Sequence, residues 1–523
     1  MKRLITLIVF ACLIFLRAEA QVEMQKITPL SPNAASLQKC VDMPPGTFTG
    51  VPSIGMPLYT VEAKGISLPI GLSYHAGGNK VETVPSFVGL GWSVTGIPMI
   101  TRGVRGIPDE NGGVFYGYEG LTVKELWDTS TTGISGRGLW NGYLRAAEAG
   151  NADLESDVYY YSLNGKSGKF FYDQESEQFL TYPFENIKIT YAEPGDYMTF
   201  KIIDDNGNQY FFTERETSTT NENYWGVLRE ETTITGWYCS KILNANRTDS
   251  ILFSYSTDET VTLNKRSVSK FIPVIQMACT GVSTLDVQTS QRDYENVALN
   301  IWTVQFSKGK IEFSSSATQR EDFEGGYSLD TIFVYNHLNE KVKQFNLHYD
   351  YLSGEDCNMY DDTDNKWLLL KELDEVDVTN SSNIQKYKYT YDETTIPACK
   401  TSAAQDFWGY HNGKYLNQDL VPSGFLHHEA LTGPKPFFGA NRFVDTSYTQ
   451  FGILKKIEYP TGGYTEYEYE NNTATDTILP TRTKIVSADL EGEDPITTNY
   501  YSTTFTINNP PDLFMNDNNA SGG

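Results

Sequence analysis

From Val158 onward the sequence consists of short strand-like runs joined in pairs by turns, and this succession constrains the fold more than any other feature. Residues 158–172 place aromatic and polar side chains on both sides of Asn164-Gly165, a dipeptide that favours tight β-hairpin turns. Tyr197–Phe212 repeats the arrangement around Asn206-Gly207. Because no helical patterns alternate with these runs, the sequence predicts an all-β chain in which a large antiparallel sheet meanders through successive hairpins.

Further strand pairs extend the predicted sheet toward the carboxyl end. We expect hairpins at 237–255, 299–313, 329–351, 366–391 and 452–470. The segments Tyr389-Thr-Tyr391 and Tyr467-Glu-Tyr469 are each followed by an acidic residue, and tyrosines two positions apart share one face of a strand. The sequence therefore predicts tyrosine ladders along one surface of the sheet.

A second constraining stretch precedes the hairpins and runs from position 68 to 102. Apolar residues alternate with small ones from Leu68 to Tyr74, which predicts a strand with one buried face. Gly89 and Gly91 flank Leu90 immediately before Trp92. Closely spaced glycines allow a tight backbone approach or positive φ, and a large indole can fill the space beside them. We interpret the stretch as the first fold of the sheet with a tryptophan anchor, and not as a catalytic loop.

The amino terminus has the pattern of a secretory signal peptide. Lys2 and Arg3 precede an apolar run from Leu4 to Leu16, and Ala18-Glu19-Ala20 supplies small residues at a cleavage site. The run is too short for a transmembrane helix, and no later segment is long and apolar enough to span a bilayer. We expect a secreted or cell-surface protein, with a lipid-anchored Cys12 as the alternative.

Charge and cysteine content exclude several functions. The net charge of −25 repels phosphate backbones, so nucleic acid is not an expected partner. The spacing of the five cysteines after residue 20 contains no Cys-x-x-Cys, which argues against a zinc knuckle or a dense disulfide scaffold. A Cys357–Cys399 disulfide remains open.

The expected organisation follows from these patterns. Ser31-Pro32-Asn33 and Pro44-Pro45-Gly46 are interpreted as helix breakers in an extended lead-in. The predicted regions are a signal peptide (1–20), this lead-in (21–50), an amino-terminal β region with the Gly-Leu-Gly-Trp motif (51–157), a β-hairpin shell region (158–475), and carboxy-terminal strands with a flexible tail (476–523).

Several of these motifs resemble those of secreted RHS/YD-repeat proteins. Leu68–Tyr74, Gly89–Val94 and Ile100–Arg102 are similar to the start of their shell-forming region, and to the start of the B components of insecticidal toxin complexes. The segments 164–170 and 404–413 resemble motifs of the secreted family members.

The last motif of this kind matches the core of a YD repeat. In 459–470 the matching positions are Gly463, Thr465, Tyr467, Tyr469 and Glu470. A full repeat continues with Asp, Gly and Arg, whereas Asn471-Asn472-Thr473 follows here.

The resemblance implies a spiralling antiparallel sheet that forms part of a hollow shell. In the family such shells enclose a polymorphic toxin or act as surface scaffolds. We therefore predict an exported, non-enzymatic β-scaffold that encloses or displays a carboxy-terminal effector-type segment, with other shell segments or cell-surface components as partners. The alternatives are a surface adhesin or glycan-binding module and, less favoured, a β-rich glycosidase.

The residues on which this prediction rests are structural, and no catalytic, cofactor-binding or metal-binding residue is predicted. They are Leu90, Trp92, Arg102, Trp408, Tyr467 and Tyr469. Trp408 lies in the densest aromatic cluster, which we interpret as a packed corner of the sheet. A sugar-stacking platform at Trp408 is the competing interpretation.

Other groups of polar residues are better explained as parts of loops than as metal-binding or catalytic sites. His427-His428 and His411 would need a carboxylate such as Asp406 or Asp419 to bind a metal, and a solvated loop is the simpler reading.

Asp204-Asp205-Asn206-Gly207 lacks the full spacing of a calcium loop, and a hairpin tip explains it more simply. The denser acidic segment 361–365 is interpreted as a solvated loop, with weak calcium binding as the alternative. Ser93 is not in a nucleophile elbow, and no Gly-Lys-Ser/Thr follows Gly103-Val-Arg-Gly106, so neither predicts catalysis or phosphate binding.

Overall fold

The computed structural model describes most of the chain between residues 28 and 505. The described ranges are 28–42, 44–112, 114–115, 117–130, 134–148, 151–192, 198–224, 227–257, 261–271, 286–322, 324–355, 363–426, 435–437, 439–472, 482–487 and 500–505. The predicted signal peptide, Asp361-Asp362, His427-His428 and most of the predicted tail lie outside these ranges.

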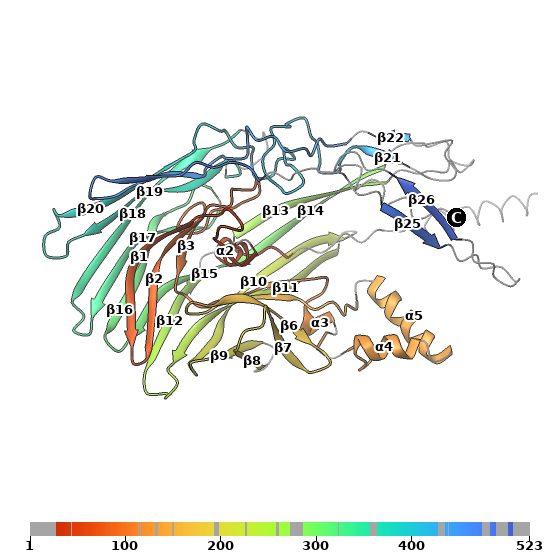
Figure 1. Ribbon diagram of the computed structural model, residues 1–523, viewed down its shortest axis with the longest axis horizontal. Helices are drawn as coiled ribbons and strands as arrows, with labels where there is room; N and C mark the ends of the chain where they lie inside the picture. Colours follow the sequence, from red (N-terminus) through yellow and green to blue (C-terminus); the bar gives the residue numbers. More distant parts are fainter. Residues whose placement is uncertain are drawn as a thin grey trace, which may run out of the picture.

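A large antiparallel sheet dominates the described structure (Figure 1), which confirms the predicted fold class. Its strands in chain order are β4 (Met99–Gly103), β5 (Val158–Ser162), β6 (Ser167–Asp173), β7 (Gln178–Tyr182), β8 (Lys188–Ala192), β9 (Thr199–Ile203), β10 (Gln209–Tyr224), β11 (Val227–Leu243), β12 (Ser250–Thr257), β13 (Val261–Phe271), β14 (Asp286–Val297), β15 (Leu299–Phe306), β16 (Gly309–Gln319), β17 (Tyr327–Asn336), β18 (Lys341–Ser353), β19 (Lys366–Val376), β20 (Ile384–Tyr391), β23 (Leu454–Glu458) and β24 (Tyr464–Glu466).

The strand pairings form a branched path. One line of neighbours runs β7-β6-β5-β4-β11-β12-β15-β16-β17-β18-β19-β20-β23-β24. The long strand β10 pairs with β11 along its length and adds β9-β8 at one end and β14-β13 at the other. No ladder among the described strands joins the ends of this path, so the sheet is open.

Most predicted hairpins are confirmed, because local turn chemistry sets them. Gly165 and Gly207 have φ of 75° and 83° at the predicted turns, a conformation that glycine adopts without steric cost. The hairpin expected at 237–255 is confirmed only over 241–243 and 250–252. Residues 236–238 of β11 pair instead with β4, and β12 pairs with β15 on its other side.

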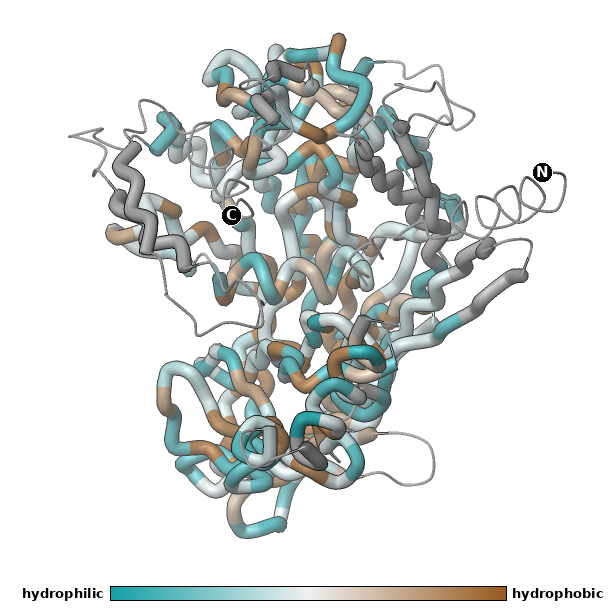
Figure 2. Tube along the Cα trace, turned by 90° about the vertical axis from the view of Figure 1, so that its right-hand side faces the viewer, coloured by the Kyte–Doolittle hydropathy of each residue, from teal (hydrophilic) through white to brown (hydrophobic). Residues whose placement is uncertain are grey.

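A smaller sheet packs on the large one. It contains β1 (Ser53–Ala63), β2 (Ile66–His75) and β3 (Trp92–Thr95) in that order, all antiparallel. The predicted alternation in β2 is confirmed, since Leu68, Ile70, Leu72 and Tyr74 are buried. These side chains belong to the same continuous hydrophobic core as the inner face of the large sheet. Hydrophobic and hydrophilic residues are accordingly interspersed along the strands (Figure 2).

The lead-in is not wholly extended, which corrects the interpretation of Ser31-Pro32 as a breaker. Helix α2 spans Pro32–Asp42. The Ser31 hydroxyl accepts a hydrogen bond from the Ala34 amide at 3.3 Å, as an N-cap does. Pro32 stands at the first helical position, where its missing N–H costs nothing. The same residues that end a helix elsewhere therefore begin one here.

The region 51–157 also contains helices that the sequence analysis did not predict as such. They are α3 (Asp109–Gly112), α4 (Val123–Ser130) and α5 (Ile134–Glu148). Helix α4 begins with a capping box: the Thr122 amide donates to the Glu125 carboxylate at 3.0 Å, and the Glu125 amide donates to the Thr122 hydroxyl at 3.2 Å.

Two short hairpins complete the described strands, β21 (Gly424–Leu426) with β22 (Lys435–Phe437) and β25 (Arg482–Ser487) with β26 (Tyr500–Phe505). None of the helices in the described ranges combines the length and apolar character needed to cross a membrane.

Candidate functional site

The Gly-Leu-Gly-Trp motif joins the small sheet to the large one. The Leu90 amide donates to the Leu368 carbonyl on β19 at 2.8 Å. Gly89 has a φ of 113°, and a Cβ there would lie 3.1 Å from the Leu370 amide nitrogen. The backbone of the motif thus passes directly against the backbone of β19, which a side chain at position 89 would prevent.

Trp92 fills the space beside these glycines and is 1% exposed. Its indole N–H donates to the Tyr391 hydroxyl at 2.8 Å, and that hydroxyl donates onward to the Leu370 carbonyl at 2.6 Å. The ring centroid lies 4.8 Å from that of Tyr389 in an edge-on arrangement. Burial raises the pKa of Tyr391 well above its usual value, so its hydroxyl remains a neutral donor.

Tyr74 extends this junction to β23. Its hydroxyl accepts a hydrogen bond from the Leu454 amide at 2.9 Å, and its ring lies 5.4 Å from that of Trp92. Leu90, which is fully buried, contacts the backbone turn at Gly452. Strands β19, β20 and β23 therefore all contact the amino-terminal sheet through a few side chains.

Arg102 on β4 is fully buried and holds α3 against the sheet. Its guanidinium donates to the Ile234 carbonyl at 2.9 Å and to Glu110 at 2.6 Å, and it lies 3.6 Å from Asp157. Burial raises the pKa of the Asp157 carboxyl to about 7 and that of Asp109 to about 6. The cluster is a buried ion network that fixes one end of the sheet.

Tyr467 and Tyr469 follow β24 and pack against the core from its edge. Their rings stack with centroids 6.4 Å apart, and the Tyr469 hydroxyl donates to the Leu454 carbonyl at 2.9 Å. These two tyrosines are partly buried rather than fully exposed.

Trp408 does not pack into a corner, and that interpretation is wrong. Its side chain is 63% exposed. The loop is held by Asp406, whose carboxylate accepts hydrogen bonds from the Trp408 and Tyr410 amides at 2.8 and 2.9 Å. This cap and long-range hydrogen bonds, such as that from the Val81 amide to the Gly409 carbonyl at 3.0 Å, hold the segment, while the indole faces solvent.

His411, three residues later, is fully buried among aromatic rings. Its ring lies 5.0 Å from that of Tyr448 and 5.3 Å from that of Tyr415, and burial lowers its pKa to about 4. Asp406 and Asp419 both accept backbone amides rather than converging on His411. The described residues therefore do not assemble the histidine–carboxylate metal site weighed for this region.

Asp204 caps its own hairpin turn. Its carboxylate accepts hydrogen bonds from the Asn206 and Asn208 amides at 2.9 and 2.8 Å, in keeping with a turn rather than a calcium loop.

The cysteines differ in their bonding. Cys399 is disulfide-bonded, with its other cysteine outside the described residues, while Cys40 and Cys239 are free.

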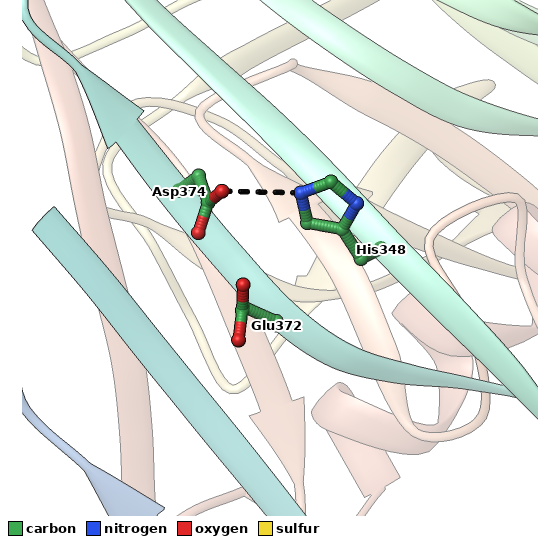
Figure 3. Close-up of side chains that lie close together, drawn as sticks. All are labelled: His348, Glu372 and Asp374. Atoms are coloured by element: carbon green, nitrogen blue, oxygen red, sulfur yellow. Dashed lines mark hydrogen bonds and ion pairs between the residues drawn. The ribbon is translucent and has the colours of Figure 1, made fainter. Parts of the chain in front are cut away.

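A cluster that the sequence analysis missed lies on β18 and β19. His348, Glu372 and Asp374 offer ligand atoms that all lie within 4.8 Å of one another (Figure 3). His348 pairs directly with Glu372 in the strand register, and Asp374 stands two positions further along β19. The signal that could have revealed it is the Glu-Leu-Asp sequence at 372–374, which places two carboxylates on one strand face.

Comparisons with known proteins find only distant likeness. No protein-family model and no curated protein sequence matches the chain. The crystal structure of TcdB2-TccC3-TEV is similar with a TM-score of 0.34 and 11% identity, over 67% of this chain and 16% of that chain. The N-terminal domain of effector protein SpvB from Salmonella typhimurium strain LT2 gives a TM-score of 0.22 and 10% identity, over 65% of this chain and 94% of that domain.

Proposed function

We propose that the chain is an exported, non-enzymatic β-scaffold whose large sheet is part of a wall that encloses or displays other polypeptide segments. The observation that carries the proposal is the continuous path of antiparallel strands from β12 to β24, one face of which lies in a single hydrophobic core with β1–β3. Such a sheet separates two spaces by its extent and needs no reactive group.

The other face of this sheet supports the same role. Charged side chains there form ion pairs between neighbouring strands, such as Lys343–Glu375 at 2.9 Å, and within one strand, such as Lys456–Glu458 at 2.7 Å. A wall with one apolar packed face and one charged face remains soluble while excluding water from its core. Among the described strands, β24 pairs with β23 alone, and an unpaired strand edge is a place where another strand can add.

Export is supported by two features. The first twenty residues have the order of a signal peptide, and Cys399 forms a disulfide, a bond that persists mainly in oxidising compartments.

Protease protection tests the enclosing role. We expect a polypeptide segment enclosed by the wall to resist trypsin while the wall is intact, and to become sensitive in Trp92→Ala, which opens the junction between the sheets. Trp408→Ala is the matched control, because its indole contributes little packing, and should leave protection unchanged. Equal digestion in all three proteins would contradict the proposal.

One observation favours a second candidate function, glycan binding. The Trp408 indole is 63% exposed on a loop fixed by Asp406, so it offers a flat surface on which a sugar ring can stack. Binding on a glycan array that is lost in Trp408→Ala would support it. Trp302→Ala is the control, since Trp302 is 57% exposed on β15. Equal binding by both variants would refute a specific site at Trp408.

A further inference from the structure

The cluster on β18 and β19 has the geometry of a metal site. Glu372 and Asp374 are two positions apart on β19, so both side chains leave the same face, and His348 approaches from the paired position on β18. The His348 Nε2 atom lies 3.2 Å from the Asp374 Oδ2 atom. Figure 3 shows the imidazole facing the Asp374 carboxylate, with the Glu372 carboxylate close beside them.

Asp374 adds an independent sign of a missing partner. The residue is 4% exposed, yet its Oδ1 atom accepts no hydrogen bond within the described part of the chain. Buried carboxylate oxygens almost always have a donor, and an unsatisfied one is costly. A cation held between the three side chains would supply that partner.

We propose that His348, Glu372 and Asp374 form a binding site for a divalent transition metal of the zinc class. One imidazole nitrogen and two carboxylate oxygens are ligands that zinc accepts at about 2.0–2.2 Å, which puts tetrahedral ligand atoms roughly 3.3–3.6 Å apart. The observed separations of 3.2 Å for one pair and at most 4.8 Å for the others need only small side-chain rotations. Calcium and magnesium prefer all-oxygen sites, so the imidazole disfavours them.

Lys386 on β20 competes for this position. Its ammonium lies 2.5 Å from Glu372 and 3.4 Å from Asp374, and Lys388 lies 4.0 Å from Glu372. The Lys386 side chain is 47% exposed, so it can move into solvent when a metal ion replaces it. Metal binding is thus an exchange of the lysine ammonium for a metal ion, which predicts a modest metal affinity. It also predicts that removing the lysine and removing a ligand change this affinity in opposite directions.

Removing the lysine should strengthen metal binding, whereas removing a ligand should weaken it. Exposed ion pairs are weak, so Lys386→Gln should raise Zn²⁺ affinity by about two- to five-fold. Loss of residues that merely orient a ligand lowers metal affinity roughly 10- to 100-fold, so His348→Ala should cost at least about ten-fold. Both side chains are about half exposed, so neither substitution should unfold the protein.

Titration of the purified chain with Zn²⁺ by calorimetry, and with Co²⁺ by its visible absorption, measures both effects. His337→Ala removes an exposed histidine from the β17–β18 turn, and Lys343→Gln removes a lysine that pairs with Glu375. Both controls should bind Zn²⁺ as the unaltered chain does. A rise in thermal stability with Zn²⁺, absent in His348→Ala, would show that the ion links β18 to β19.

Two results would overturn the proposal. The first is the absence of saturable Zn²⁺ or Co²⁺ binding even in Lys386→Gln, which would leave the cluster as an ordinary ion-pair network. The second is unchanged binding in His348→Ala together with its loss when His427 and His428 are replaced, which would place the site elsewhere. The scaffold proposal is unaffected by either result, since protease protection does not depend on metal.

Discussion

Trp92 and Trp408 each stand beside a glycine in a turn-rich segment, yet the fold buries one indole and leaves the other 63% exposed. Trp92 contacts Tyr74 on the neighbouring strand β2, and Tyr389 and Tyr391 on the distant strand β20. Trp408 lies in a loop that is capped by the Asp406 carboxylate and also bonded to distant backbone, since the Val81 amide donates to the Gly409 carbonyl, yet its indole stays exposed. The comparison shows that a tryptophan beside a glycine becomes an anchor where other side chains enclose its indole.

The largest expected difference between the two regions is the cost of truncating the buried indole. Trp92→Ala removes the contacts with Tyr74 and Tyr389 and leaves a cavity in the core. Truncation of a buried tryptophan lowers the free energy of unfolding by about 3–5 kcal/mol. Urea denaturation followed by circular dichroism measures it, and a loss below about 1 kcal/mol would contradict the anchor role.

A pair of glycine substitutions separates backbone strain from close contact. Gly91 and Gly165 have nearly the same φ, 77° and 75°, but a Cβ at Gly91 would lie 2.5 Å from the Tyr74 ring, whereas nothing lies within 4 Å at Gly165. Gly165→Ala should cost about 1–2 kcal/mol from the left-handed conformation alone. Gly91→Ala should cost about 1–3 kcal/mol more from overpacking. Equal unfolding free energies for the two variants would show that the contact is unimportant.

Removing one hydroxyl tests the polar part of the anchor. Tyr391→Phe leaves the buried Trp92 indole N–H without its acceptor and removes the donor to Leu370. An unsatisfied buried donor costs about 1–3 kcal/mol, so the variant should lose that much unfolding free energy. In the Trp92→Phe background, Tyr391→Phe should lower the free energy of unfolding by less than it does in the unaltered protein. Strict additivity of the two losses of unfolding free energy would argue against the hydrogen bond.

Acid should weaken the Trp408 loop through His411. Its folded pKa of about 4 lies below the unfolded value, so the unfolded chain binds a proton first, and stability falls as pH drops from about 6.5 toward 4. His411→Phe should reduce the stability lost between pH 7 and pH 5 by about 1–2 kcal/mol. His75, whose pKa burial also lowers to about 4, contributes a parallel loss that this variant retains. His337→Ala, an exposed-histidine control, should leave the loss unchanged in the same denaturation experiment.

The smallest effect is expected for Trp408→Ala. An exposed side chain away from the core changes the free energy of unfolding by about 0.5 kcal/mol or less. A loss of several kcal/mol in urea denaturation would show that the indole packs after all, and the contrast with Trp92 would disappear.

Local patterns predicted the hairpins because both strands and the turn lie within about fifteen residues. Asn164-Gly165 and Asn206-Gly207 fix their turns whatever the rest of the chain does. The start of α2 was missed for the opposite reason. Ser31 and Pro32 suit either a break or a helix start, and contacts with distant residues decide between them: the Ser31 hydroxyl also donates to Glu216 at 2.6 Å.

The candidate site could be predicted only in part: the Glu-Leu-Asp sequence places two carboxylates on one strand face, but the histidine opposite them depends on register. His348 faces Glu372 only through the particular alignment of β18 with β19, which shifts at a bulge directly after His348. A displacement of one residue would turn the carboxylates to the opposite face. The burial of Arg102 was equally hidden, since arginine is seldom buried unless it is paired, and its partners Glu110 and Asp157 come from separate segments.

The bond between Trp92 and Tyr391 spans 299 residues of sequence. A ribosome that adds about 5–20 residues per second needs roughly 15–60 s to make that span. The two strands of the β5–β6 hairpin, by contrast, are made within a few seconds of each other. The buried face of β2 is therefore among the first parts of the shared core to be synthesised and among the last to be covered. Throughout that interval, its apolar side chains are available to chaperones and to aggregation.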